Sequence, residues 1–298
     1  MLSRVSMSRV SILKIIGILG LFFAVILEAS APAVASPSLL DARAFPVVPY
    51  AGARARRLVL IGRARGNRAN VFSKVGDSIT QFGYFLVPVG NGGLRLGGYG
   101  NLGGAAQWFS TTMARTNNSF ANDSLAANGG WTSYDLLDPS KAVPGICNGG
   151  ATPIECELGV SRPAVALIMI GTNDLAHGNV AGFQANLNRI VSITESFGVI
   201  PVISTIPERH DNSVLGSRVP AFNDAIIRVA LAHGAPLWNY WLAMDKLGNS
   251  GLMGDGVHPS IPPDQNTAVF DDFHLQFGFT VRNLTALQVL NNLLPVLR

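Results

Sequence analysis

The chain has 298 residues, of which 48% are hydrophobic and 13% are charged, and its formal net charge is +4. This composition excludes an intrinsically disordered protein, and the length is sufficient to bury one full hydrophobic core. The basic residues are not interleaved with aromatic ones, so the sequence gives no pattern of nucleic-acid binding.

The first 35 residues have the three parts of a secretory signal peptide. Three basic residues precede an apolar run at Ile15–Leu27, and Ala33–Ala35 gives a small-x-small cleavage site. We therefore expect a cleaved signal peptide over residues 1–35 and a secreted protein, either extracellular or periplasmic. The alternative is an uncleaved anchor, but the run of about 13 apolar residues is shorter than the roughly 20 that span a bilayer.

Residues 36–50 are rich in Pro and Ala and predict an exposed linker before a single domain at 51–298, whose core begins at 71. Seven basic residues lie between Arg54 and Lys74. A solvated basic helix or linker is the favoured interpretation of this stretch, and attraction to an anionic surface is the alternative. The pattern over 54–65 fits either a short helix or an edge strand.

From residue 71 onward, short apolar runs alternate with stretches in which apolar residues recur at helical spacing. We expect strands at 71–75, 165–170, 199–205 and 236–238. We expect helices over 183–194, 222–230 and 281–294. Strands separated by helices predict βαβ crossovers and an α/β fold with a mainly parallel sheet. The chemistry of such sheets lies at the carboxyl ends of the strands.

The stretch 90–104 contains eight glycines. A phosphate cradle is one interpretation, but no Gly-Lys-Ser/Thr sequence closes the stretch and no strand leads into it. A flexible loop that borders a substrate cleft is the favoured alternative. We therefore expect no cofactor. A nucleotide-binding protein of flavodoxin type would share the architecture but lacks support from any phosphate motif.

The sequence Gly76-Asp77-Ser78 follows directly after the apolar run at 71–75. This position places Ser78 where a strand ends and a helix begins, so that its N–H belongs to a helix N-terminus with partial positive charge. Such a position suits a nucleophile whose attack creates an oxyanion. The alternative is that Ser78 is a helix N-cap, because Asp and Ser are preferred there.

Three later fragments favour the nucleophile. They are Asn128-Gly129-Gly130, Gly171-Thr172-Asn173-Asp174 after the apolar run at 164–169, and Asp255-Gly256-Val257-His258. In this order and spacing, from about residue 51 to the end, the four fragments resemble the SGNH (GDSL-type) hydrolase superfamily. The resemblance implies a three-layer α/β/α sandwich with a flavodoxin-like sheet.

The resemblance also implies a role for each fragment. Ser78 would attack an ester carbonyl, His258 would accept the serine proton, and Asp255 would orient the imidazole. The Ser78 N–H, the Gly130 N–H and the side-chain amide of Asn173 would form the oxyanion hole.

The residue types suit these roles. Asp255 lies three residues before His258, close enough in a tight turn to accept its second ring N–H. Glycine lets backbone approach a substrate, although Gly129 and Gly130 are adjacent and the register is open. The amide of Asn173 donates hydrogen bonds without carrying charge. Only His258 combines an acidic residue at i−3 with a glycine-containing turn followed by Pro. The other candidates for the base are His177, His210, His233 and His274.

Three neighbours of these residues have two interpretations each. Asp77 and Asp174 fit a second base or a metal ligand, but hydrogen bonds to loop amides are the favoured interpretation. Trp131 fits either stacking on a sugar or acyl group, or packing in the core.

Cys147 and Cys156 are the only cysteines of the chain. A close pair in an exported protein predicts a disulfide that pins the intervening loop. A metal site is disfavoured, because no histidine or further cysteine lies nearby with ligand spacing.

Together these features predict an exported serine esterase that hydrolyses carboxylic (O-acyl) esters through an acyl-enzyme, without metal or cofactor. The substrate would be a small-molecule or polysaccharide ester, and lipase-like, short-chain esterase and carbohydrate deacetylase activities all stay open. The alternative is a non-catalytic extracellular carbohydrate-binding or surface protein on the same scaffold. No nucleic-acid partner is expected, and no membrane span after signal cleavage.

Overall fold

The computed structural model describes residues 38–298, so the expected signal peptide at 1–35 lies outside the described residues. Among the residues that are described, no helix has both the length and the apolar character needed to cross a bilayer.

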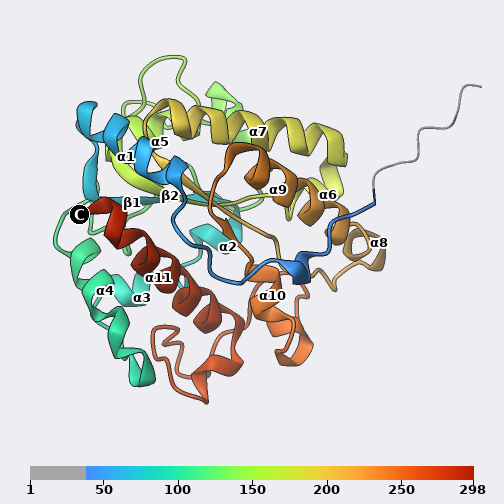
Figure 1. Cartoon of the computed structure of the whole chain (residues 1–298). Helices are drawn as coiled ribbons and strands as arrows, with labels where there is room; N and C mark the ends of the chain where they lie inside the picture. Colours follow the sequence, from blue (N-terminus) through green and yellow to red (C-terminus); the bar gives the residue numbers. More distant parts are fainter. Residues whose placement is uncertain (1–37) are drawn as a thin grey trace, which may run out of the picture. The chain divides into compact units, whose positions relative to one another are not determined.

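The centre of the fold is a four-stranded sheet in the order β1-β2-β3-β4, in which every neighbouring pair is parallel (Figure 1). The strands are β1 (Arg68–Gly76), β2 (Pro163–Met169), β3 (Ile200–Ser204) and β4 (Leu237–Trp238). They match the four expected strands, and the α/β fold class is confirmed. On the free side of β1, Gly76 makes a parallel bridge to Ala127, which brings the following loop to the end of β1.

Helices cover both faces of the sheet. In Figure 1, α5 (Pro153–Ser161), α7 (Val180–Ser196) and α9 (Val219–His233) lie above the sheet, and α4 (Gly103–Ser110) and α11 (Gly278–Leu297) lie below it. Helix α1 (Ala53–Ala64) contacts α11 and β1. The three layers agree with the expected α/β/α sandwich, and α7, α9 and α11 cover the three stretches with helical spacing.

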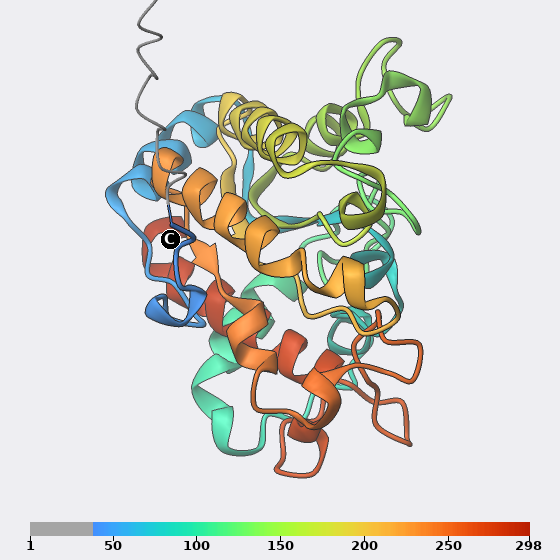
Figure 2. The same ribbon diagram turned by 90° about the vertical axis from the view of Figure 1, so that its right-hand side faces the viewer.

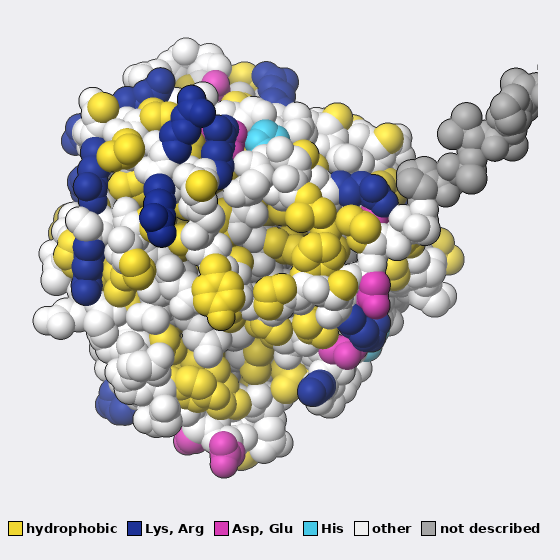
Figure 3. Space-filling view, viewed as in Figure 1, with side chains coloured by type: hydrophobic (Ala, Val, Ile, Leu, Met, Phe, Trp, Pro, Cys, Tyr) yellow, Lys and Arg dark blue, Asp and Glu magenta, His cyan; other side chains and the backbone are white. Residues whose placement is uncertain are grey.

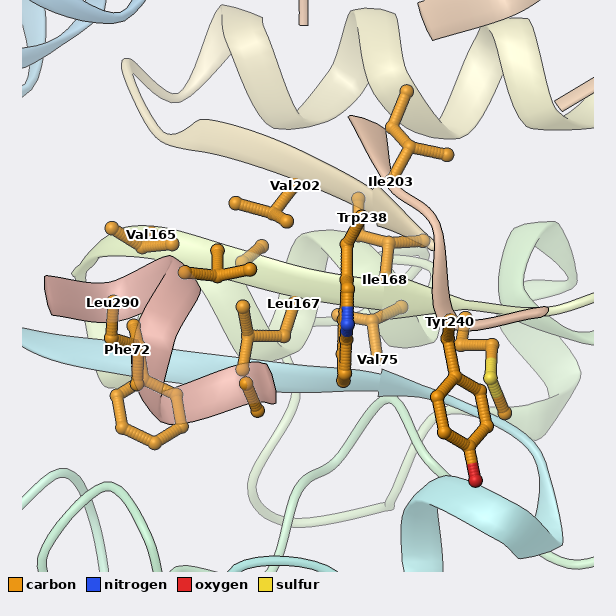
Figure 4. Packing of buried hydrophobic residues seen from close by; sticks show 14 of the residues in the cluster. Phe72, Val75, Val165, Leu167, Ile168, Val202, Ile203, Trp238, Tyr240 and Leu290 are labelled. Carbon is orange, nitrogen blue, oxygen red and sulfur yellow. The ribbon is translucent and has the colours of Figure 1, made fainter. Parts of the chain in front are cut away.

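Apolar runs without polar alternation explain why these segments form buried strands. Every residue of β2 and β3 is buried, as parallel strands covered on both faces require. Figure 4 shows Val75, Ile168 and Val202 from adjacent strands in one core, with Leu290 of α11 beside Phe72 of β1. The sheet and α11 therefore share a core directly behind the carboxyl edge.

Shorter elements connect these segments. The short α-helices are α2 (Ser78–Gln81), α3 (Val87–Gly90), α6 (Asp174–His177), α8 (Ser213–Gly216) and α10 (Tyr240–Met244). The 3₁₀ turns are η1 (Ala42–Ala44), η2 (Gly97–Leu102), η3 (Asp135–Leu137), η4 (Pro139–Lys141), η5 (Gly248–Gly251) and η6 (His274–Gln276). In Figure 2, the loops that carry residues 128–150 and 255–277 project on the same side of the molecule.

Residues 39–50 of the expected linker at 36–50 run along the surface of the domain, with several side chains exposed and none buried. They belong to the compact unit that contains the sheet. The Leu40 N–H donates to Asp224 of α9, and the Asn239 side chain donates to the carbonyls of Ala42 and Phe45. Polar side chains of the domain thus satisfy the backbone of this segment, which its Pro and Ala content does not reveal.

The basic stretch divides into two parts. Residues 53–64 form the helix α1, whose Arg56 and Arg57 are exposed. Figure 3 shows Lys and Arg side chains gathered on the side of the molecule where Figure 1 places α1. Lys74 lies in β1, and its ammonium group donates to the Phe120 carbonyl at 2.8 Å. Burial lowers the pKa of Lys74 to about 8. The expectation of a solvated stretch is therefore wrong for Lys74, because a backbone carbonyl at the sheet edge replaces water.

The glycine-rich stretch 90–104 is built into helical elements rather than forming one long loop. It contains the end of α3, the whole of η2 and the start of α4. Arg95 exchanges backbone hydrogen bonds with Ala268 and Phe270. The stretch therefore packs along the segment that precedes α11.

Candidate active site

Close packing at the end of β1 requires a glycine at position 76. A Cβ on Gly76 would clash with the Met169 carbonyl oxygen and would lie 2.5 Å from Thr80 Oγ1. Because Gly76 has none, β1 packs against the end of β2 while the chain folds back into α2. This arrangement places the first residue of α2, Ser78, at the carboxyl edge of the sheet.

Asp77, rather than Ser78, caps α2. The Asp77 carboxylate accepts the Ile79 N–H at 3.0 Å, and Asp77 is completely buried. The capping role is therefore filled by the neighbour of the serine, and the Ser78 hydroxyl is left for other contacts. Burial raises the pKa of Asp77 to about 6, against the opposing charge of Arg282.

The Ser78 hydroxyl lies against a histidine 180 positions later in the chain. Ser78 Oγ is 2.9 Å from His258 Nε2, and His258 Nδ1 is 2.7 Å from Asp255 Oδ2. These distances suit a serine, a base and a carboxylate that orients the base. When Asp255 accepts the Nδ1–H, the lone pair of Nε2 faces the hydroxyl, which is the tautomer that a base needs.

The tight turn between Asp255 and His258 fixes both side chains. Asp255 Oδ1 accepts the N–H groups of Val257 and His258, each at 3.0 Å. Gly256 has a φ of +69°, and a Cβ there would lie 2.5 Å from the Asp211 nitrogen. Burial acts to raise the pKa of Asp255, but the hydrogen bonds from Val257 and His258 outweigh it and lower the pKa overall. Asp255 is therefore held as a carboxylate.

Asn173 joins the loop after β2 to the loop that contains Trp131. Its Nδ2 donates to the Trp131 carbonyl at 2.9 Å. An amide carries two hydrogens on this nitrogen, so one is left for a ligand. The Trp131 side chain is partly buried and packs against the core, in agreement with the packing alternative for this residue.

The adjacent glycines at 129 and 130 differ in the use of their N–H groups. The Gly129 N–H donates to Gln81 Oε1 at 2.7 Å. Within residues 38–298, the Gly130 N–H donates no hydrogen bond. Gly130 has a φ of +76°, and the space where its Cβ would stand is open. The geometry therefore favours Gly130 as the glycine whose amide can face a substrate.

Asp174 holds the same loop through Ser133. Asp174 is buried, and its carboxylate accepts both the backbone N–H and the hydroxyl of Ser133. Asn186 of α7 donates to the same hydroxyl at 3.1 Å. Burial raises the pKa of Asp174, and the Ser133 hydrogen bonds oppose that rise. Asp174 thus hydrogen-bonds a loop amide, as expected, whereas Asp77 hydrogen-bonds an amide of α2.

His258 is the histidine of residues 38–298 that reaches the Ser78 hydroxyl. The others have separate environments: His177 is exposed on α6, His210 pairs with Asn249, His233 pairs with Asn188 and Glu195, and His274 pairs with Asp264 and Asp271.

Two residues of the site are not named by the motifs. Gln81 engages Gly129, and the Phe82 ring packs edge-to-face on the His258 imidazole, with 5.2 Å between ring centroids. In a helical turn that begins at Ser78, positions 81 and 82 lie on the same face as the serine. Counting the helical period from Ser78 is the signal that identifies both.

Cys147 and Cys156 form a disulfide, which confirms the predicted pairing. It joins the loop before α5 to α5 itself. In the part of the chain that the structure describes, no group of three or more His, Cys, Asp or Glu side chains is placed to hold a metal ion.

Comparison with protein families identifies a match over residues 75–261 to the GDSL-like lipase/acylhydrolase family. This range begins next to Gly76-Asp77-Ser78 and ends just after His258. A comparison with curated proteins gives no match.

Several solved structures are similar to this chain. A GDSL-like lipase from Bacteroides thetaiotaomicron has 15% identity, covers 79% of this chain and 96% of its own, and gives a TM-score of 0.47. A catalytic mutant of an acetylxylan esterase from Geobacillus stearothermophilus has 15% identity, and the match covers 74% of this chain and 93% of that one, with a TM-score of 0.46. A carbohydrate esterase of family 3 from Talaromyces cellulolyticus has 18% identity, covers 74% and 97%, and gives 0.46.

Proposed function

Because the chain belongs to the GDSL-like lipase/acylhydrolase family and is a carboxylic ester hydrolase, we propose that Ser78, His258 and Asp255 form its catalytic triad. The observation that carries this proposal is the continuous chain of short contacts, 2.9 Å from Ser78 Oγ to His258 Nε2 and 2.7 Å from His258 Nδ1 to Asp255 Oδ2. Ser78 comes from the turn that follows β1, whereas His258 and Asp255 come from one tight turn 180 positions later in the chain.

In the acylation step, Ser78 Oγ attacks the ester carbonyl carbon while His258 Nε2 takes the hydroxyl proton. The carbonyl π bond breaks and its electron pair becomes the oxyanion. The tetrahedral intermediate then collapses, the bond to the alcohol oxygen breaks, and His258 returns the proton to the leaving alcohol. Asp255 stabilises the imidazolium that exists between these two transfers.

The oxyanion would be held by the Ser78 N–H, the Gly130 N–H and the free amide hydrogen of Asn173. The Ser78 N–H lies in the first turn of α2, where backbone donors have no partner within the helix. Deacylation repeats the same chemistry, with His258 activating a water that attacks the acyl-enzyme and releases the acid.

Labelling with a fluorophosphonate tests the nucleophile. The reagent should attach to Ser78 in the native chain, and the Ser78→Ala variant should stay unlabelled while keeping its melting temperature. A folded native chain that resists the reagent would instead support a non-catalytic carbohydrate-binding protein on the same scaffold.

The Asn173→Ala variant tests the oxyanion hole. Loss of one such donor should reduce turnover by about 10²–10³-fold. Asn188→Ala, on the exposed side of α7 and bonded to His233, is the matched control and should hydrolyse at the native rate. Near-native turnover of Asn173→Ala would remove Asn173 from the site.

The substrate is proposed to be an ester outside the cytoplasm, either a small molecule or an acylated polysaccharide. The signal-like composition of residues 1–35 and the Cys147–Cys156 disulfide support export. A panel of p-nitrophenyl esters of rising chain length, run beside acetylated sugars, measures acyl length and alcohol preference separately. Hydrolysis of the p-nitrophenyl esters but of none of the acetylated sugars would restrict the proposal to small-molecule esters.

A further inference from the structure

We propose that Arg282 is a positioning residue for the nucleophile: from α11, its guanidinium holds the turn α2 so that the Ser78 hydroxyl and N–H face the ester carbonyl. This inference rests on the proposed role of Ser78. It begins from a charged side chain that has no place in the catalytic mechanism and yet lies at the core of the domain.

Arg282 is buried among aromatic rings. Its exposed fraction is 1%, and its guanidinium carbon lies 3.7 Å from the centroid of the Phe85 ring. The rings of Tyr240 and Trp238 lie 5.7 and 5.8 Å away. Burial lowers the pKa of Arg282 to about 10, so the group is still charged at neutral pH. A buried charge is costly unless its hydrogen-bonding groups find partners.

Those partners are both in the nucleophile turn. One terminal nitrogen of Arg282 donates to the Ile79 carbonyl, and the other donates to Thr80 Oγ1 at 3.0 Å. Helix α2 has only four residues, and its backbone ladder is short: the Gln81 and Phe82 N–H groups donate to the Asp77 and Ser78 carbonyls, which leaves the Ile79 carbonyl for Arg282. The planar fork of a guanidinium matches two acceptors on consecutive residues, which a single ammonium group does not.

Arg282 also compensates the charge on the other side of Ser78. Asp77 is completely buried, and its Oδ2 has no hydrogen-bond partner. Burial favours the neutral form of Asp77, and the positive charge of Arg282 is the largest influence that opposes this. An ionised Asp77 accepts the Ile79 N–H more strongly than a neutral one. The guanidinium therefore acts on the residues directly before and after the serine.

The consequence for catalysis is geometric. With Asp77 and Ile79 both held, the peptide groups on either side of Ser78 cannot rotate, so the direction of the Ser78 N–H is set before substrate arrives. A displacement of about 1 Å at a reacting group can cost roughly 10²-fold in rate. Arg282 touches no substrate and acts only through α2.

Three variants test the proposal. Arg282→Met removes both donors and the charge, Arg282→Lys keeps the charge without the fork, and Thr80→Val removes one acceptor. For Arg282→Met we expect kcat and the rate of fluorophosphonate labelling per folded molecule to fall by about 10²-fold, with little change in KM. The losses for Arg282→Lys and Thr80→Val should be smaller, and amide hydrogen exchange over 77–82 should quicken in all three.

Arg68→Met is the matched control. Arg68 also donates to backbone carbonyls, those of Met113, Ala114 and Ser161, but it lies at the opposite end of β1 from Ser78. Its loss should lower the melting temperature while leaving the labelling rate per folded molecule and exchange over 77–82 unchanged. This separates a general loss of stability from a loss of positioning.

Native labelling rates and native exchange over 77–82 in the Arg282 variants would overturn the proposal and leave the triad standing. If Arg282→Met does not fold, the same two readouts in Arg282→Lys and Thr80→Val decide. If the native chain itself is not labelled, the proposed function fails, and exchange over 77–82 alone decides whether Arg282 holds the turn.

Discussion

Two turns of the molecule, at 255–258 and at 271–274, share the pattern Asp-x-x-His and orient their imidazole rings in the same way. In each turn, the aspartate three residues before the histidine accepts hydrogen bonds from the histidine backbone N–H and from ring Nδ1. The distance from Nδ1 to the carboxylate oxygen is 2.7 Å in both turns. They differ at the other ring nitrogen. In the first turn Nε2 faces Ser78 Oγ, and in the second it lies 3.2 Å from Asp264 Oδ2.

This difference shows that the local Asp-x-x-His pattern orients the histidine ring. The group that faces Nε2, which comes from elsewhere in the sequence, determines the role of the ring. Because Asp255 holds the hydrogen of His258 on Nδ1, Nε2 faces the Ser78 hydroxyl with a lone pair that can accept its proton. Burial acts to lower the pKa of His274, but the hydrogen bonds to Asp271 and Asp264 outweigh it and raise the pKa. A ring between two carboxylates is favoured as imidazolium, which cannot take a proton from a serine.

The largest difference between the two turns is expected when the imidazole ring of each histidine is removed. His258→Ala should lower kcat by about 10⁶-fold, because the base and the acid of the mechanism are lost together. His274→Ala should leave kcat near the native value and change only the melting temperature. Hydrolysis of p-nitrophenyl acetate by the two variants measures this. Equal losses would mean that the 271–274 turn belongs to the active site.

The carboxylates sharpen the same contrast. Asp255→Asn should reduce kcat by about 10⁴-fold, since an amide no longer fixes the Nδ1–H tautomer of His258. Asp271→Asn makes the same chemical change in the other turn and should have no such effect. Rates for both variants, compared at one pH and with equal amounts of folded protein, provide the measurement. A native rate for Asp255→Asn would remove the aspartate from the triad.

The smallest expected effect is a pH-dependent contribution of the 271–274 turn to stability. The folded-state pKa of His274 lies above its unfolded value of 6.5, so the stability it contributes is complete below that value and is lost as the pH rises through the folded pKa. The melting temperature of His274→Gln should therefore differ most from the native one in acid.

Measurements at about pH 5.5 and about pH 8.5 make this visible. Melting curves of the native chain and of His274→Gln give the stability difference at each pH. A difference in melting temperature that grows in alkali would contradict the ion-paired state of His274.

The layers of the fold and the candidate triad were accessible from sequence because local pattern and long-range role agree there. Apolar runs without alternation mark strands buried on both faces, and Gly76 and Ser78 fall at the end of one of them. Helix α5 shows the limit. Its capping box at Thr152 and Glu155 is a readable start signal. Yet Glu157 within it is completely buried, where it accepts hydrogen bonds from Ser73 and Ser161.

Buried cations show a second limit of the sequence, and one of them, Lys74, accounts for the wrong expectation over the basic stretch. Sequence reasoning assigns Lys and Arg to the surface, since most of them are there. Lys74 and Arg282 are inside because carbonyl groups from other segments, at Phe120 and Ile79, accept their hydrogen bonds. Such acceptors are invisible until the chain is folded, and the same holds for the side chains that anchor residues 39–50.

The contact between Arg282 and Ile79 spans 203 positions. During synthesis, Ser78 and its turn emerge long before His258, the proposed base. The guanidinium of Arg282 on α11 emerges later still. A growing chain that ends before residue 255 therefore contains Ser78 without its proposed base, and a fragment cut before α11 contains Ser78 and His258 without the guanidinium of Arg282. Under the proposed mechanism, hydrolysis therefore requires segments that are synthesised well after the turn that contains Ser78.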